Sequence, residues 1–320
     1  MEVRAAVVRS FDRPPAYERF DLPGPADGQV LIDVLAAGLH PRVRSGASGR
    51  HYTSTGKLPM VPGIDGVGRR ADGQVVYFVT DEDTAGSMAT RAVIDPRRSV
   101  PVPVGSDVVK IAAAMNPAMS SWVALRRRVP IQPGQSVLIL GATGNAGQLA
   151  IQIARHLGAG RVIGAGRDLD RLAMLPAIGA DATVALTDDA HATAAALAEA
   201  ASDVDLVIDY LWGKPASEAI MALLRARADR SRALDWIQIG AMAGPTTELP
   251  SVALRSANLR LLGNGQGAVS ASAYLAELPS LMDEINDGGI AVTTRAVPLA
   301  DVETAWTAPD TPGTRTVLVT

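Results

Sequence analysis

Three glycines near the middle of the chain have the spacing of a loop that binds a phosphate. They are spaced G-x-x-G-x-x-G within LILGATGNAGQLAIQIARHLGA, residues 138–159. Glycine permits a tight turn and a close approach of the backbone to a pyrophosphate, and a helix N-terminus offers free N–H groups. An apolar run precedes the loop and helical periodicity follows it, so we predict dinucleotide binding rather than an ordinary strand–helix turn. The predicted loop residues are Gly141, Ala142, Thr143, Gly144, Asn145, Ala146 and Gly147.

The residues after the next apolar run distinguish between the two nicotinamide dinucleotides. NAD sites usually have Asp or Glu there to hold the ribose 2′-hydroxyl, whereas NADP sites leave room and supply arginine. This chain has Gly166, Arg167, Asp168 and Arg171. Because two guanidinium groups can bind a 2′-phosphate, we predict NADPH. The alternative is that Asp168 holds the ribose or caps a helix while both arginines face solvent.

The composition limits the class of protein. The chain has 320 residues, about two domains by length, and 48% of them are hydrophobic, which is enough for a substantial core. The net charge of −3 and the scattered Lys and Arg favour neither nucleic acid nor a membrane as a partner. Cysteine is absent, which excludes disulfides and cysteine-containing zinc sites.

No targeting or membrane segment is evident in the sequence. The first apolar run contains charged residues, unlike a signal peptide, and no stretch approaches the roughly 20 apolar residues that span a bilayer. We therefore expect a cytoplasmic protein.

The hydrophobic pattern changes near the middle of the chain. Up to about residue 129, short apolar runs are separated by proline and glycine, which is typical of strands and turns. From residue 136, strands alternate with helices, which predicts a parallel sheet with right-handed crossovers. The predicted strands of this part are 136–140, 161–166, 182–186, 204–210 and 234–240. The last stretch, 259–320, adds a strand at 259–263, a helix near 272–288 and closing strands at 293–299 and 314–320.

This order of regions resembles the medium-chain dehydrogenase/reductase superfamily, and within it the zinc-independent quinone oxidoreductase branch. The similar segments are 28–46, 58–68, 115–128, 141–159 and 298–319, so the resemblance covers nearly the whole chain. It implies an α/β protein with a β-rich, GroES-like catalytic domain of residues 1–125 and 256–320. A Rossmann domain with a doubly wound parallel sheet, residues 126–255, would be inserted into it. The resemblance also implies a homodimer built by extending the Rossmann sheet.

The resemblance bears on metal chemistry as well. The zinc enzymes of the superfamily have Cys where this chain has Leu39, and a His-Glu pair where it has Ile64 and Asp65. A site improvised from His40, His51 and Asp65 does not match the ligand spacing, so we predict no metal. Hydride transfer from NADPH to a quinone or to an α,β-unsaturated carbonyl needs no Lewis acid.

Two residues are candidates for catalysis. Tyr52 falls where related reductases often place a tyrosine in the cleft, and its hydroxyl could bind a carbonyl oxygen or protonate an enolate. His40 takes the position where the family often has asparagine, and its imidazole could donate a proton. The alternative interpretations are a buried structural tyrosine and a polar end to a turn.

The nicotinamide end of the cofactor is expected near two further segments. The resemblance points to the backbone of Gly240, Ala241 and Met242 and to that of Gly263, Asn264 and Gly265. The glycines allow close approach, although they could simply turn the chain. Ser120 and Ser121 are candidates for a place beside the nicotinamide ribose.

One motif points away from this family. Tyr210 and Lys214 have the Y-x-x-x-K spacing of short-chain reductases, but Tyr210 ends an apolar run and Pro215 follows Lys214. We therefore expect no helix that carries both side chains.

The resulting hypothesis is a zinc-independent, NADPH-dependent reductase of a small-molecule quinone or enone. A non-catalytic NADPH sensor or structural protein is the alternative from another class, since a fold does not fix a function. An enoyl reductase of a biosynthetic pathway would share the chemistry and differ in its substrate.

Overall fold

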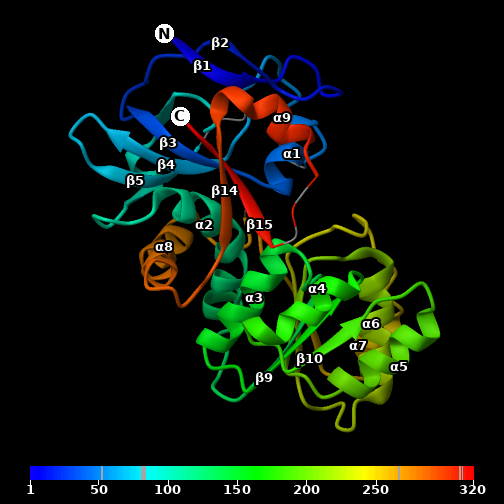
Figure 1. The fold of residues 1–320 in the computed structure, drawn as a ribbon. Helices are drawn as coiled ribbons and strands as arrows, with labels where there is room; N and C mark the ends of the chain where they lie inside the picture. Colours follow the sequence, from blue (N-terminus) through cyan, green and yellow to red (C-terminus); the bar gives the residue numbers. More distant parts are fainter. Residues whose placement is uncertain (52, 81–83, 266, 310, 312) are drawn as a thin grey trace. The chain divides into compact units, whose positions relative to one another are not determined.

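The computed structural model describes residues 1–51, 53–80, 84–265, 267–309, 311 and 313–320 (Figure 1). The chain forms two compact units. The first unit comprises Met1–Asn116, Leu278–Gly288 and Val292–Thr320, and the second comprises Pro117–Glu277 and Gly289–Ala291. The two units share no sheet, so each is described by itself.

The first unit is rich in antiparallel strands. β1 (Glu2–Val7) pairs with β2 (Ala16–Asp21), and a larger sheet has the order β14-β15-β3-β4-β5-β7, with β6 also paired to β3. Its strands are β3 (Val30–Leu39), β4 (Asp65–Arg70), β5 (Val75–Val79), β6 (Arg91–Ile94), β7 (Ser99–Pro101), β14 (Thr293–Pro298) and β15 (Thr314–Val319). The short helices are α1 (Pro41–Ala47), η1 (Pro96–Arg98), η4 (Leu299–Asp301) and α9 (Val302–Thr307).

The second unit is built on a six-stranded parallel sheet. Its order is β10-β9-β8-β11-β12-β13, so the order of strands reverses between β8 and β11. The strands are β8 (Ser136–Leu140), β9 (Arg161–Gly166), β10 (Ala182–Ala185), β11 (Leu206–Asp209), β12 (Leu234–Gln238) and β13 (Leu259–Gly263). The helices are α3 (Asn145–His156), α4 (Leu169–Met174), η3 (Leu175–Ile178), α5 (Ala190–Ala201), α6 (Gly213–Ala226) and α7 (Ser251–Arg255). The predicted α/β class with a doubly wound sheet is confirmed.

The central strands explain why this sheet forms. All four apolar residues of β8, from Val137 to Leu140, are fully buried, as are Leu206, Val207 and Ile208 of β11. Strands that are apolar on both faces need helices on both faces, which is the usual environment of a parallel sheet. The core between them contains Trp236 and Ile220.

Two long helices belong to both units. α2 (Val108–Val123) crosses the boundary at residues 116–117 and continues into a π-helical turn, η2 (Ala124–Arg128), while α8 (Ala271–Asn286) crosses at residues 277–278. The observed division therefore differs from the predicted one of 1–125 and 256–320 against 126–255. The reason is that β13 pairs with β12, which keeps residues 259–263 in the second unit.

The helix formed by α2 and its π-helical turn also differs from an expectation. Val108–Arg128 has 21 residues and a mean hydropathy of 1.2, so by length and composition alone it passes the test for a membrane span. This is the apolar stretch that we did not expect. However, 67% of an 18-residue apolar stretch of this helix is buried inside the structure, as in the core helix of a globular protein.

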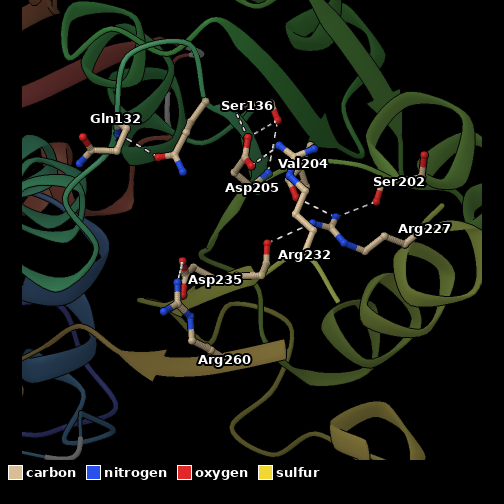
Figure 2. A network of polar contacts seen from close by, with 11 residues as sticks. Gln132, Ser136, Ser202, Val204, Asp205, Arg227, Arg232, Asp235 and Arg260 are labelled. Atoms are coloured by element: carbon tan, nitrogen blue, oxygen red, sulfur yellow. Dashed lines mark hydrogen bonds and ion pairs between the residues drawn. The ribbon is translucent and has the colours of Figure 1, made fainter. Parts of the chain in front are cut away.

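Polar contacts hold the amino ends of the parallel strands together (Figure 2). Asp205, directly before β11, accepts hydrogen bonds from the backbone N–H (2.8 Å) and the hydroxyl (2.9 Å) of Ser136 at the start of β8, and it pairs with Arg232. Arg260 of β13 pairs with Asp235 of β12. These contacts fix neighbouring strands at the edge opposite the glycine loop.

Candidate cofactor and catalytic site

The glycine loop joins the carboxyl end of β8 to α3. Gly141 has a φ of +85°, a conformation that favours glycine, and its N–H and that of Ala142 both donate to the carbonyl of Ala165 at 2.9 Å. A side chain on Gly147 would place its Cβ 2.3 Å from the Gly141 carbonyl oxygen. Gly144 is the N-cap of α3, and no side chain caps this helix. The loop therefore presents first-turn N–H groups that have no partner within the helix.

The segment after β9 lies against this loop. Asp168 is the N-cap of α4, because its carboxylate accepts a hydrogen bond from the N–H of Arg171 at 3.0 Å. The same carboxylate pairs with the Arg171 side chain (Nε to Oδ2, 3.1 Å), and Nη1 of Arg171 donates to the Thr143 carbonyl at 3.4 Å. Arg167 is exposed, and Gly166 is buried. The structure thus brings Arg171 to the glycine loop and shows Asp168 as the helix cap of the alternative interpretation.

The segment after β12 meets the end of β11, and the segment after β13 meets the end of β12. The N–H of Gly240 donates to the Asp209 carbonyl (3.1 Å), and the N–H of Met242 donates to that of Tyr210 (3.2 Å). The N–H of Asn264 donates to the carbonyl of Gln238 at 2.8 Å. Ala241 and Gly263 are exposed, and Gly265 is half-buried. The two predicted nicotinamide segments therefore lie at the same edge of the sheet as the glycine loop, at the carboxyl ends of the strands.

Asp209 organises the turn that follows β11. Its buried carboxylate accepts hydrogen bonds from the N–H groups of Leu211 (2.8 Å) and Trp212 (2.9 Å) and from the indole of Trp236 (3.0 Å). Burial raises the pKa of Asp209, and the three donors oppose this shift. The carboxylate holds Trp212 at a φ of +52°. Such a conformation persists only where the surroundings fix it.

The supposed Tyr-Lys pair is not carried by one helix. α6 begins at Gly213, so Tyr210 precedes it and Lys214 lies in its first turn. Pro215 also lies in that first turn, where a missing N–H is tolerated, rather than ending the helix. The short-chain reductase motif is therefore absent from these residues, as expected.

A second polar cluster lies in the first unit around His40, the N-cap of α1. His40 is 3% exposed, and its Nε2 lies 3.3 Å from Oδ1 of Asp65, the first residue of β4. The hydroxyl of Tyr77 on β5 donates to Oδ2 of Asp65 at 2.9 Å. The Ser87 hydroxyl donates to the Asp65 backbone carbonyl at 2.6 Å. Four segments of the chain thus converge at Asp65.

The environment of His40 determines its state. Burial lowers the pKa of His40 below its usual 6.5, and contact with Asp65 only partly offsets this effect. A carboxylate accepts hydrogen bonds but donates none, so the Nε2–H of His40 donates to Asp65 and Nδ1 is left as an acceptor. His40 is therefore neutral at pH 7 and holds its ring proton toward Asp65.

Comparison with known proteins agrees with this geometry. The zinc-binding dehydrogenase family matches residues 146–272. The chain is 29% identical to the probable NADPH-dependent quinone reductase tdiC of Emericella nidulans over 99% of this chain and 100% of that protein. The solved structure of the quinone oxidoreductase from Thermus thermophilus has a TM-score of 0.81 and 24% identity, covering 99% of this chain and 100% of the other. These matches confirm the predicted resemblance to the medium-chain dehydrogenase/reductase superfamily.

The matched relatives include quinone reductases, so the predicted resemblance to the quinone oxidoreductase branch is also confirmed. The chain is also 26% identical to an NADPH-dependent alkenal/one oxidoreductase of Arabidopsis thaliana, a match that covers 51% of this chain and 46% of that protein.

The two predicted catalytic residues differ in where the structure places them. Tyr52 lies outside the described residues. His40 lies in the first unit, and the glycine loop lies in the second. The contact of Tyr77 with Asp65 was not predicted, because nothing in the residues near position 77 signals a partner twelve positions earlier. Asp209 was not predicted either, although a lone carboxylate at the end of an apolar strand is a usable signal.

Proposed function

We propose that this protein is an NADPH-dependent oxidoreductase that transfers hydride to a quinone or to an α,β-unsaturated carbonyl. The glycine loop carries the proposal, because its backbone is drawn together so closely that a Cβ on Gly147 would overlap the Gly141 carbonyl. Such a cradle fits a pyrophosphate at the start of α3. The full-length match to a probable NADPH-dependent quinone reductase supports the same cofactor and acceptor.

The residues present suit each part of the dinucleotide. The loop of residues 141–147 would hold the pyrophosphate, and Arg171 and Arg167 would hold the 2′-phosphate. The segments 240–242 and 263–265 would hold the nicotinamide end, because they lie at the carboxyl edge of the same sheet. NADPH supplies the hydride when bound, and the protein contributes orientation and exclusion of water.

Tyr52 and His40 are the proposed groups for handling the proton. The hydrogen bond of His40 to Asp65 limits how His40 can take part in proton transfer. Because its Nε2–H faces Asp65, a neutral His40 would offer Nδ1 to a partner as a hydrogen-bond acceptor. Delivery of a proton from His40 would first require protonation of Nδ1.

The proposal has three further parts: the reaction needs no zinc, the protein is cytoplasmic, and it forms a homodimer. Zinc independence is supported by the absence of cysteine and by Leu39 and Ile64, whose side chains cannot bind zinc at the positions where the zinc enzymes have ligands. The dimer is supported by β13, which lies at the end of the parallel sheet and pairs only with β12 among the described residues. Leu261 on β13 and Val252 and Leu254 on α7 are exposed apolar side chains nearby in sequence.

The test is oxidation of NADPH, followed by the nicotinamide absorbance, after treatment of the protein with a chelator. A small quinone and a conjugated enone are offered separately, with NADH in parallel. We expect turnover with NADPH and much less with NADH. Binding of NADPH with no reduction of either acceptor would favour the sensor hypothesis, and equal turnover with NADH would remove the role of Arg167 and Arg171.

A further inference from the structure

Tyr210 begins a chain of polar contacts at the point where the strand order reverses. It follows β11 directly, and a Cβ on Gly141 would lie 3.2 Å from the Cβ of Tyr210, so the two loops touch. The hydroxyl of Tyr210 lies 3.0 Å from that of Ser120 on α2. All of these residues belong to the second unit. A dinucleotide binds an open α/β sheet across the point where the strand order reverses. Tyr210 is therefore next to the expected dinucleotide site.

The direction of the hydrogen bond follows from the proton count. The Ser120 hydroxyl has one proton, and it donates this proton to the Pro117 carbonyl at 2.8 Å. With the Ser120 proton on the Pro117 carbonyl, Tyr210 is the donor to Ser120. Burial raises the pKa of Tyr210 to about 12, so the phenol keeps its proton. A phenol whose proton is both tightly held and already donated is a poor acid for the reaction.

The chain of contacts continues to the end of β13. The side-chain amide of Asn264 donates to the backbone carbonyl of Ser120 at 2.8 Å, and Asn264 is 5% exposed. Its backbone N–H is bonded to Gln238 at the end of β12. Ser120 therefore links two loops that are separate in sequence: the turn after β11 through its hydroxyl, and the turn after β13 through its carbonyl.

We propose that Tyr210, Ser120 and Asn264 are positioning residues that set where the nicotinamide half of NADPH lies. This inference rests on the proposed function. The three residues join the loops after β11, β12 and β13 to a buried helix, and those loops border the nicotinamide half once the pyrophosphate is on the loop of residues 141–147. Their side chains fix the loops rather than touch the reacting atoms. A small displacement of the reacting ring is enough to slow hydride transfer.

The test is a double-mutant cycle with Tyr210→Phe, Ser120→Ala and the combined variant. Both single changes remove the bond between Tyr210 and Ser120. Ser120→Ala also removes the bond to the Pro117 carbonyl, and Tyr210→Phe also removes the contact with Ser121, while the backbone carbonyl that Asn264 uses remains in both. We expect each single variant and the double variant to lose kcat by a similar factor, about tenfold, because the effects of one shared bond do not multiply. The Kd of NADPH should change by less than about threefold, because the phosphates that dominate affinity are bound elsewhere. Tyr17→Phe, on β2 of the first unit, is the matched control.

A second measurement does not depend on turnover of the enzyme. The fluorescence emission of NADPH bound to the protein reports the surroundings of the nicotinamide, and we expect Tyr210→Phe and Ser120→Ala to shift it alike while Tyr17→Phe leaves it unchanged. Losses that multiply in the double variant, or an emission spectrum that none of the variants changes, would overturn the positioning role. Bound NADPH that is never oxidised would overturn the proposed function alone, since the emission would still test the network. No binding of NADPH by the unmodified protein would overturn both.

Discussion

At the scale of single residues, the glycine loop depends on one very close approach. The Cβ of an alanine at position 147 would lie 2.3 Å from the Gly141 carbonyl oxygen and 2.6 Å from the Ala142 Cα, both backbone atoms that cannot move aside. The same substitution at Gly144 would place its Cβ at an ordinary 3.4 Å from the Gly141 oxygen. Two glycines of one motif therefore have different physical reasons for being glycine.

Gly147→Ala is expected to weaken NADPH binding by at least about tenfold, since α3 must move away from β8 and the loop loses its shape. Gly144→Ala should have a distinctly smaller effect. Fluorescence titration with NADPH measures both, and thermal unfolding shows whether the fold survives. Equal effects of the two substitutions would contradict this account of the loop.

His40 makes stability depend on pH. Its pKa is lowered by burial in the folded state, whereas an unfolded chain restores a value near 6.5. Below about pH 6.5 the unfolded state therefore binds more protons than the folded state, so the free energy of unfolding decreases as the pH falls through the folded pKa. We expect unfolding by urea at pH 7.5, 6.0 and 5.0 to show this loss. In His40→Gln the decrease over this range should be smaller, and an unchanged slope would show that other groups cause it.

At the scale of elements, Arg227 joins several backbone carbonyls at the amino edge of the parallel sheet. It is 3% exposed and donates to the backbone carbonyls of Ser202 (2.9 Å), Val204 (2.9 Å) and Ala233 (3.0 Å), as Figure 2 shows in part. These carbonyls lie in the turn after α5 and in the turn before β12. The Arg227 side chain thus supplies the hydrogen-bond donors for three backbone carbonyls near the start of the strands.

Arg227→Gln is expected to lower the free energy of unfolding by about 2–4 kcal/mol, because buried carbonyls lose their donors. Arg225→Gln is the matched control: the side chain is exposed, and surface changes usually stay within about 0.5 kcal/mol. Urea unfolding of both variants measures the difference. If Arg227→Gln behaves like Arg225→Gln, water satisfies these carbonyls instead.

The secondary-structure elements were predicted well from the sequence, whereas the strands and residues that contact one another were not. The apolar runs at 136–140, 161–166 and 259–263 coincide with β8, β9 and β13, because local periodicity records which residues are buried. The same periodicity does not state which strand lies beside another, so 259–263 was assigned to the wrong side of the domain boundary. The contact between Tyr77 and Asp65, and that between Ser120 and Asn264, join distant segments and leave no local signal.

At the scale of the whole molecule, the side of β13 that has no partner strand in the described part of the chain has consequences for assembly. An edge strand that carries exposed apolar side chains offers backbone groups and apolar surface to a second copy. Leu261 is 36% exposed on this strand. A dimer formed there would continue the sheet across its two-fold axis.

Leu261→Lys is therefore expected to convert a dimer to a monomer, or to weaken the dimer by at least about tenfold, since a charge would be buried at the interface. Sedimentation velocity over a range of concentrations measures the change. Leu169→Lys, an exposed leucine on α4, is the control. A protein that is monomeric before any substitution would contradict the proposed homodimer.

The pairing of β15 with β3 has a consequence for synthesis. Val319 faces Ala36 in this antiparallel pair, so the larger sheet of the first unit lacks a strand until the ribosome has passed residue 319. At about 5–20 residues per second, the roughly 200 residues between the first unit's early part and β15 take roughly 10–40 s to make. All six parallel strands of the second unit are complete earlier, by residue 263. The nascent chain therefore carries an unpaired edge of β3 while all six strands of the second unit are already made, and such an edge can pair with another chain.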